Sequence, residues 1–344
     1  MELEIINSLL GFFSSFIVFY VSYKVQNKVK NNYRFKKDFY HENAVKIHFS
    51  KELEVESQRV DFDKINENKY KDVITYFCVV LINHFEPYVL NCFYNNINTL
   101  RVSDSVKSIS DIINMISLSG VYYNEENSIV LYRNNRRATL YHELFHMASS
   151  YLDGDNFFSG FSYCNSNSKD MSKDFGDGIN EGYTELLTRR YFSNVEHIES
   201  DYDYQVLIVS LLEEIVTRDV MERLYLTADF QGLMVILKKY MYEDEIFLFV
   251  KNMDFVLEHG LDEGLNKHNK KILDGVTRDI TVFLVKAYFK KVYLMDRSEF
   301  EKDKLVDRYI TKIIGHPNLL LSYDEMIDII NKEKDRLICI RLDR

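Results

Sequence analysis

Residues Thr139–Tyr151 have the sequence TLYHELFHMASSY. In this stretch His142 and His146 stand four residues apart, and Glu143 directly follows the first histidine. Helical periodicity begins at about Arg136, and residues four positions apart on a helix project from the same face. Both imidazoles can therefore bind one metal ion, with the glutamate beside its open coordination position. The alternative is an amphipathic helix that carries two ordinary, partly buried histidines.

The residues before this helix predict a β-hairpin. Two β-rich runs, Val121–Tyr123 and Ser128–Tyr132, flank the polar turn NEEN. The helix itself is expected to extend to Tyr151, which shares its apolar face with Leu140 and other apolar residues.

A metal that catalyses hydrolysis needs a third protein ligand. A histidine in the pattern H-E-x-x-H-x-x-G-x-x-H is excluded, because Ser149 and Leu152 occupy the positions of the glycine and the last histidine. The later stretch DGINEGYTELLTRRYF is predicted to be a helix, and it places Glu181 and Glu185 on one face. One carboxylate can bind the metal, and the other can accept the N–H of a liganding histidine. The alternative is an ordinary solvated helix face.

The pair HELFH and GINEGYTE resembles the gluzincin metallopeptidases, the thermolysin-like group, in which the third zinc ligand is the glutamate of an N-E-x-x-x-D pattern. The resemblance implies that His142, His146 and Glu181 hold one Zn²⁺ ion per chain. It also implies that Glu143 is the general base and then the general acid, and that Glu185 fixes the tautomer of a liganding histidine. In gluzincin-like folds an edge strand next to the active-site helix holds the substrate backbone, so the resemblance implies that Ser128–Tyr132 is such an edge strand, where an extended peptide could pair. The alternative is a strand that only completes a small sheet.

The resemblance covers about Val121 to Phe192, and it departs from the family pattern at two places. A glutamate stands where the family has an aspartate, and the loop between the second histidine and the third ligand is longer. The resemblance does not place the group that would stabilise the oxyanion. Tyr183 and His197 are nearby candidates, although Tyr183 points away from Glu181 on a helix.

The remaining sequence is expected to be mostly helical. The chain of 344 residues has only 2 prolines and 12 glycines, which favours long helices. Val73–Phe85 is expected to be a buried helix, Gly160–Tyr163 a short strand, and LICIRL near the end a final strand. The net charge of −10 argues against nucleic acid as a partner. The four cysteines lie far apart, which favours buried thiols in a reducing compartment over disulfides.

The N-terminal segment Ile5–Tyr23 is apolar and carries no charge. As a helix it is just long enough to span a bilayer core of about 30 Å. Glu2 and Glu4 precede it, and the basic stretch Lys24–Lys37 follows it. The basic flank should stay cytoplasmic, so we expect an uncleaved anchor with the rest of the chain inside the cell. The alternative is an apolar helix that docks on the soluble domain or lies in the membrane interface.

Together these patterns predict an α+β fold: a predominantly helical zincin-like domain with a small sheet before the active-site helix, preceded by one transmembrane helix. The predicted parts are a transmembrane helix (5–23), a basic juxtamembrane segment and connector (24–72), a metallopeptidase core (73–200) and a helical region that completes the same domain (201–344). The predicted function is a membrane-anchored zinc metallopeptidase acting on a peptide or protein substrate. Two alternatives are a non-catalytic metal-binding or scaffold protein, and a regulatory protease dedicated to one protein partner.

Overall fold

The computed structural model describes residues 59–104, 119–132, 137–165, 175–193, 202–260, 267–314, 316 and 319–342. The predicted anchor Ile5–Tyr23 and the basic segment Lys24–Lys37 lie outside these residues. Within the described ranges, no helix is long and apolar enough to cross a membrane. All described residues except Lys267–Asn269 belong to one compact unit, which comprises Ser50–Leu265 and Lys270–Arg344.

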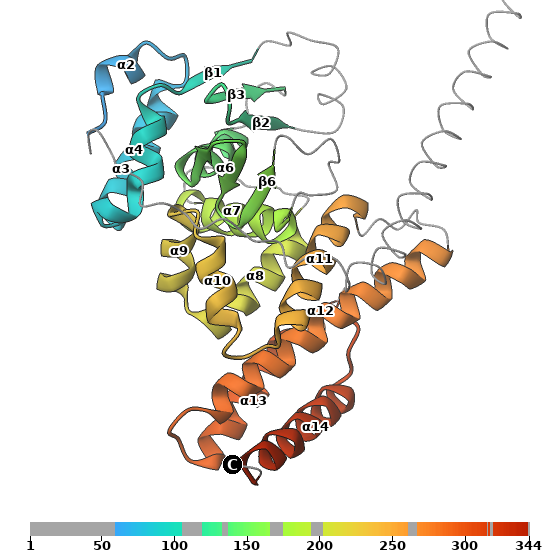
Figure 1. Ribbon diagram of the computed structural model, residues 1–344. Coiled ribbons are helices and arrows are strands. Elements are labelled where there is room, and N and C mark those ends of the chain that lie inside the picture. The colour runs from blue at the N-terminus through green and yellow to red at the C-terminus, as the bar shows by residue number, and fades with distance from the viewer. Residues whose placement is uncertain are drawn as a thin grey trace, which may run out of the picture. The chain divides into compact units, whose positions relative to one another are not determined.

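The described residues are mainly helical and also form two small sheets, as the α+β prediction requires (Figure 1). The helices of the first half are α2 (Phe62–Asn66), α3 (Lys71–His84), the 3-10 helix η1 (Pro87–Leu90), α4 (Asn91–Ile97) and α6 (Arg137–Ala148). Those of the second half are α7 (Asp177–Phe192), α8 (Asp203–Val216), α9 (Arg218–Leu226), α10 (Phe230–Leu237), α11 (Glu243–His259), α12 (Lys267–Tyr293), α13 (Glu299–Ile313) and α14 (Tyr323–Leu342).

Helix α3 shows why the apolar runs became helices. Its residues Val73, Phe77 and Leu81 recur every four positions and are buried, so one face of the helix enters the core. The helix ends before Pro87, which begins η1. The predicted helix at this place is therefore confirmed. By contrast, the predicted final strand LICIRL is wrong, because these residues form the last turns of α14.

The first sheet contains β1 (Arg101–Ser103), β2 (Gly120–Tyr123) and β3 (Ser128–Leu131) in the order β1-β3-β2. Strands β2 and β3 form the predicted antiparallel hairpin. The prediction that the second run is an edge strand is wrong, because β1 pairs with β3 in parallel and leaves β3 in the centre. Among the described strands, β2 is the edge strand of this sheet that contacts α6.

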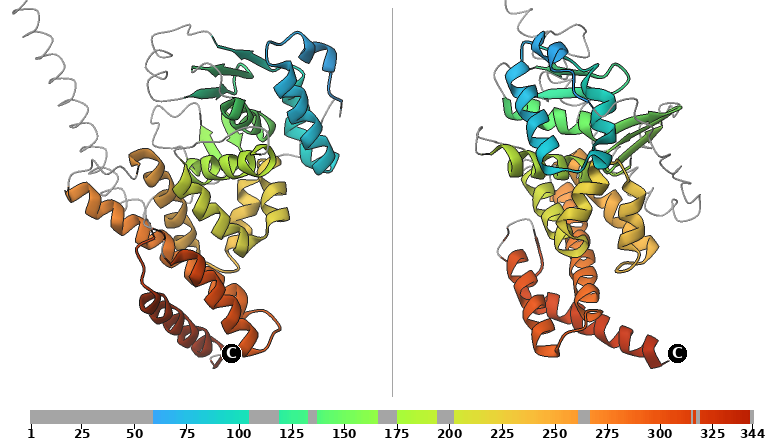
Figure 2. Two further views of the ribbon diagram at one scale, coloured as in Figure 1. Left: turned by 180° about the vertical axis from the view of Figure 1, so that it is seen from behind. Right: turned by 90° about the vertical axis from the view of Figure 1, so that its left-hand side faces the viewer.

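The second sheet is an antiparallel meander of β4 (Ser150–Asp153), β5 (Asn156–Ser159) and β6 (Ser162–Asn165), and its strands lie side by side in Figure 2. Helix α6 ends at Ala148, so the expected extension of the helix to Tyr151 is wrong. Tyr151 instead stacks on Phe158 across the first two strands, with 4.7 Å between ring centroids. The predicted strand at Gly160–Tyr163 exists two residues later, as β6.

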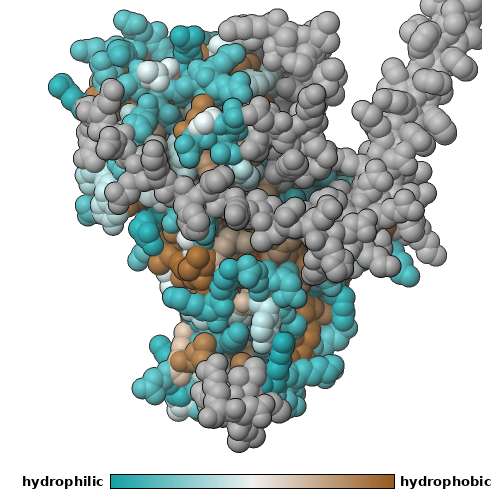
Figure 3. Space-filling view, viewed as in Figure 1, coloured by the Kyte–Doolittle hydropathy of each residue, from teal (hydrophilic) through white to brown (hydrophobic). Residues whose placement is uncertain are grey.

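The core surrounds the two helices that carry the predicted site. Helix α7 contacts α6, α8 and α11, and its residues Ile179, Tyr183 and Leu187 are fully buried. Cys78 and Cys92 are buried thiols that form no disulfide. On the face shown in Figure 3, hydrophilic residues cover most of the described surface and a few hydrophobic patches interrupt them. Because polar side chains usually lie at the surface, those that are buried beside α7 need a specific explanation.

Candidate metal centre

Helix α6 presents both predicted histidines to α7. His142 and His146 are only 8% and 9% exposed, although histidines are frequently found at protein surfaces. Their Nε2 atoms lie 3.1 Å apart, and their ring centroids lie 4.9 Å apart. The four-residue spacing therefore brings one nitrogen of each ring to the same point, as the sequence predicts.

Glu181 on α7 completes a triangle of potential ligand atoms. Its Oε2 lies 3.1 Å from Nε2 of His142, and its Oε1 lies 3.3 Å from Nε2 of His146. A tetrahedral metal with bonds of about 2.0–2.1 Å holds neighbouring ligand atoms about 3.3 Å apart. The three side chains thus fit the coordination sphere of one metal ion, and they are grouped closely enough to hold it.

Glu185 lies one turn after Glu181 and contacts the other nitrogen of His142. Nδ1 of His142 lies 3.1 Å from Oε2 of Glu185, so the carboxylate accepts a hydrogen bond from the ring. The second oxygen, Oε1, accepts a hydrogen bond of 2.9 Å from Nε of Arg189. Arg189 also donates to Asp203 at the start of α8, at 2.6 Å. Sequence reasoning predicted the contact of Glu185 but not the arginine behind it.

Asn180 is the corresponding neighbour of His146, and sequence reasoning gave it no role. Its Nδ2 lies 3.4 Å from Nδ1 of His146, and its Oδ1 accepts a hydrogen bond of 3.1 Å from the backbone N–H of Phe161. Gly160 has a φ of +52°, and a Cβ there would lie 2.4 Å from Oδ1 of Asn180. The only feature of the sequence that could have indicated a role for Asn180 is its place directly before Glu181, which matches the asparagine of the N-E-x-x-x-D pattern.

The charges of the site depend on the contacts between α6 and α7. Burial lowers the pKa of His142, but hydrogen bonds to Glu181 and Glu185 outweigh burial and raise this pKa to about 10. Burial raises the pKa of Glu181, but His146 and His142 outweigh it and hold this pKa well below its usual range. Without a metal, the site is therefore a protonated histidine paired with carboxylates, and a cation would take the place of the proton.

Glu143 is the predicted acid–base residue, and it lies between the histidines and the first sheet. It is 7% exposed, and burial raises its pKa although both histidines oppose this. The backbone N–H of Tyr122 in β2 donates a hydrogen bond to its carboxylate. A Cβ on Gly120 would lie 2.8 Å from Cγ2 of Thr139, so the glycine allows β2 to lie close to α6.

The register of the hairpin explains why this N–H of Tyr122 is available. The N–H of Tyr132 donates to the carbonyl of Ser119, so these two residues form a hydrogen-bonded pair. Because such pairs alternate along antiparallel strands, Gly120 and Tyr122 direct their backbone groups away from β3. The outer edge of β2 therefore faces Glu143.

Tyr202 contributes a hydroxyl group that sequence reasoning missed. It immediately precedes α8, and its ring stacks on His142 with 5.6 Å between centroids and 17° between planes. The Tyr202 hydroxyl is hydrogen-bonded to Glu181, and the charge of Glu181, followed by burial and the charge of Glu143, raises the pKa of this phenol. No pattern in the sequence marks Tyr202, because it belongs to neither motif and is separated from α7 by residues 194–201, which the structure does not describe.

From the sequence, Tyr183 and His197 were candidates for stabilising the oxyanion. Tyr183 is fully buried, and its hydroxyl donates to Glu213 at 2.8 Å, away from the metal ligands. Tyr183 is therefore not part of the site. His197 lies outside the described residues.

Comparisons with known proteins add no assignment to this geometry. No protein-family model, no curated protein and no solved structure matches the chain. The cluster of His142, His146 and Glu181, with the residues that contact it, is therefore the feature that indicates a function.

Proposed function

We propose that this chain is a zinc-dependent metallopeptidase. The observation that carries the proposal is the convergence of Nε2 of His142, Nε2 of His146 and the carboxylate of Glu181, with Glu143 beside them. Two imidazoles and one carboxylate are a donor set that suits zinc and leaves one coordination position open. The resemblance of both motifs to the gluzincins supports the same metal and the same reaction.

Each side chain of the site has a part in the proposed reaction. Zinc held by His142, His146 and Glu181 would supply a Lewis acid that activates water and polarises the peptide carbonyl. Glu143 would take the proton of the attacking water and pass it to the leaving amine. Glu185 holds the ring of His142 so that Nε2 faces the metal position. The hydroxyl of Tyr202 can donate to the oxygen on which negative charge develops.

The edge of β2 is the best place for the substrate backbone. Gly120 and Tyr122 direct their backbone groups away from the sheet; the N–H of Tyr122 bonds to Glu143, so a peptide would pair with the carbonyl of Tyr122 and with the backbone groups of Gly120. An extended peptide that pairs with this edge would bring its scissile bond close to the metal position. This assignment replaces the one expected for Ser128–Tyr132, whose backbone groups already pair with two neighbouring strands.

The cellular setting is part of the proposal. The apolar run Ile5–Tyr23 and the basic residues Lys24–Lys37 favour a single-pass anchor with the metal site on the cytoplasmic side. The substrate would then be a cytoplasmic peptide or protein, or a cytoplasmic part of a membrane protein.

A protease dedicated to one protein partner is the second candidate, and the burial of the site favours it. His142, Glu143 and His146 are each less than a tenth exposed, and the side chain of Glu181 is 22% exposed. So small an exposed area favours a fitted segment over arbitrary peptides.

The proposal is tested with the full-length protein in detergent, loaded with zinc and mixed with peptides from a whole-proteome digest. Mass spectrometry would identify new peptide ends, and the matched controls are the Glu143→Gln variant and the chelated wild type. We expect new ends only with the zinc-loaded wild type. If they are absent, the same assay on intact membrane and cytoplasmic protein extracts distinguishes a dedicated protease from a scaffold, since only the protease would produce a defined cleavage there.

A further inference from the structure

Helix α7 carries Glu181, and it begins without a capping side chain of its own. Its N-cap residue, Gly176, has a φ of +97° and no side chain. The first N–H groups of a helix have no partner within the helix and need one elsewhere. Here Asp254 of α11 supplies it: Oδ2 accepts from the N–H of Gly176 at 3.1 Å, and Oδ1 accepts from the N–H of Gly178 at 2.9 Å.

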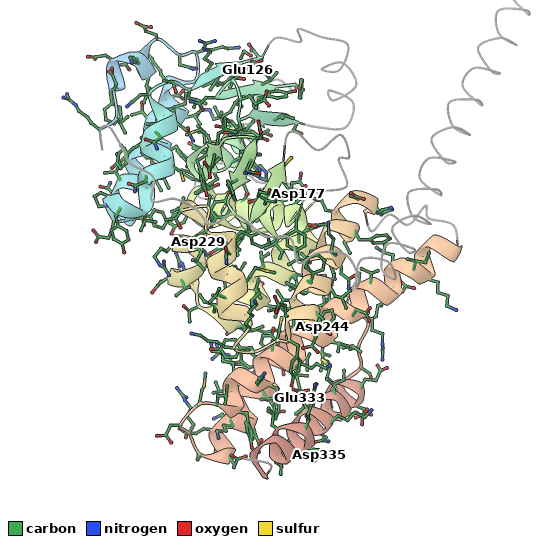
Figure 4. The ribbon with its side chains drawn as sticks, viewed as in Figure 1. Glu126, Asp177, Asp229, Asp244, Glu333 and Asp335 are labelled. Carbon is green, nitrogen blue, oxygen red and sulfur yellow. The ribbon has the colours of Figure 1, made fainter. Side chains whose placement is uncertain are left out.

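The two helices touch through their backbones at this point. A Cβ on Gly178 would lie 2.3 Å from the carbonyl carbon and oxygen of Met253, the residue before Asp254. A Cβ on Gly176 would lie 2.0 Å from the carbonyl oxygen of Phe161. Neither glycine leaves space for a side chain, so the first turn of α7 packs directly on the backbone of α11 at Gly178 and on that of Phe161 at Gly176. Figure 4 labels Asp177 between these glycines, at the start of α7.

This first turn determines where Glu181 lies. Asn180 and Glu181 follow Gly178 within one turn, and each residue of a helix adds a rise of about 1.5 Å and about 100° of rotation. Metal ligands need to stay within about 0.2 Å of their ideal distances. A small slip or rotation of the turn would therefore move the carboxylate of Glu181 away from the histidines.

Asp254 carries a carboxylate at a place where burial disfavours the charged form. Asp254 is 9% exposed, and burial raises its pKa to about 6, although Lys251 and the N–H groups of Gly178 and Gly176 oppose this. Lys251 lies 4.0 Å away on the same helix, and Glu258 adds a negative charge from the next turn. The acid next to the two glycines on α7 is Asp177, and its carboxylate accepts a hydrogen bond from Ser162.

The raised pKa of Asp254 means that its charged form does not stabilise the fold, although it can still hold α7 in position. Because the folded-state pKa of Asp254 lies above its unfolded value, protonation stabilises the fold, and that stability is lost as the pH rises through about 6. At neutral pH the carboxylate is therefore charged at a cost to the fold. Its two oxygens accept one hydrogen bond each from the helix, whereas an asparagine offers only one acceptor oxygen.

We propose that Asp254 is the positioning residue of the metal site, which holds the first turn of α7 so that Glu181 stays aligned with the two histidines of α6. This inference rests on the proposed function, because it concerns the same metal ligands. It also implies that helix α11, far from the histidines in the sequence, determines how tightly the metal binds.

The test compares the zinc affinity of the full-length protein with that of Asp254→Asn, by competition with a coloured chelator. The matched control is Asp229→Asn, since Asp229 caps α10 through the N–H of Gly232 at 2.8 Å, and α10 carries no predicted ligand (Figure 4). At about pH 7.5 we expect Asp254→Asn to bind zinc about tenfold more weakly, at the lower end of the range for residues that orient metal ligands. The control should keep the wild-type affinity.

Two further measurements distinguish a residue that positions the metal ligands from one that only stabilises the fold. Thermal unfolding of the metal-free protein should show little loss for Asp254→Asn at about pH 7.5, because the buried charge is removed. The affinity ratio between wild type and variant should narrow at about pH 5.5, where Asp254 is protonated in the wild type. A folded variant with unchanged zinc affinity would overturn the inference, whereas a wild type that binds no zinc would overturn the proposed function itself.

If Asp254→Asn does not fold, Lys251→Gln tests the same contact. This variant keeps the carboxylate and removes the cation beside it, so the pKa of Asp254 should rise further. The loss of zinc affinity on acidification should then begin at a higher pH than in the wild type. An unchanged pH profile would overturn the inference.

Discussion

Nδ1 of His142 donates a hydrogen bond to Glu185 across 3.1 Å, and this contact leaves Nε2 as the ring nitrogen that faces Glu181 and His146. The tautomer of a liganding histidine is fixed in this way by the partner of its other nitrogen. Arg189 holds the second oxygen of Glu185, so the longer glutamate arm is oriented even though the resembled family has an aspartate at this place.

Glu185→Gln should weaken zinc binding without abolishing it. The neutral amide can still accept from His142, but it loses the charge that strengthens the bond and favours the correct tautomer. We expect affinity to fall about 10–100-fold, with about one zinc per chain still bound at saturation. Chelator competition measures the change, and Glu126→Gln, on the exposed turn between β2 and β3, is the matched control (Figure 4). Equal affinity in both variants would contradict the assigned role.

Zinc binding should release a proton from His142. The pKa of this residue is raised to about 10 by Glu181 and Glu185 against the effect of burial, so the metal-free site is protonated at neutral pH. Between about pH 7 and 9 we expect about one proton released per zinc, and an affinity that rises about tenfold per pH unit. Calorimetry in buffers of different ionisation enthalpy measures the release. Binding without any proton release would contradict the pairing.

The same shift gives a pH dependence to the metal-free protein. Because the folded-state pKa of His142 lies above its unfolded value of about 6.5, its stabilising effect is complete below that pH. It is lost as the pH rises through about 10. Thermal unfolding temperatures of the metal-free protein should therefore fall over this range more steeply than those of His142→Gln. Parallel curves for the two proteins would count against the predicted protonation.

Glu143→Gln should separate catalysis from metal binding. Burial raises the pKa of this carboxyl, so its charged form costs stability above that pKa, and an uncharged glutamine removes the cost. The variant should unfold at the same or a higher temperature than the wild type at about pH 8. It should also keep its zinc and lose about 10²–10⁴-fold in peptide hydrolysis. Loss of zinc, or a clear loss of stability, would show that Glu143 has a structural role instead.

Tyr202→Phe should lower turnover and leave zinc binding intact. The ring can still stack on His142, but the hydroxyl that is hydrogen-bonded to Glu181 is lost. We expect kcat to fall about 10²–10³-fold, as for other single donors to an oxyanion. The matched control is Tyr183→Phe, which removes a buried bond to Glu213 and should lower the unfolding temperature instead of kcat. The reverse pattern would reject Tyr202 as the donor.

Local patterns predicted the elements that carry the ligands. The four-residue spacing of His142 and His146 and the later pair Glu181 and Glu185 each depend only on helical geometry. The hairpin before α6 also follows from its own residues. Each of these features is encoded within a short stretch of chain, and the structure places the predicted ligand atoms within hydrogen-bonding distance of one another.

Contacts between distant parts of the chain could not be predicted in this way. Strand β1 pairs with β3 and makes it central, and nothing within Ser128–Leu131 records that partner. Asp254 reaches α7 from 76 residues beyond Gly178, and Tyr202 approaches His142 only when the start of α8 packs on α7. The second sheet did have a local signal, the turn sequence Asp153-Gly154-Asp155, but the helix was expected to extend to Tyr151, which lies within β4.

Metal content shows most directly whether His142, His146 and Glu181 hold one zinc ion. The full-length protein, Glu181→Gln and the exposed control Glu126→Gln would be purified in parallel, dialysed against zinc and measured by inductively coupled plasma mass spectrometry. We expect about one zinc per chain in the wild type and the control, and almost none in Glu181→Gln. A wild type that retains no zinc, or a Glu181→Gln variant that retains as much as the wild type, would rule out this metal site.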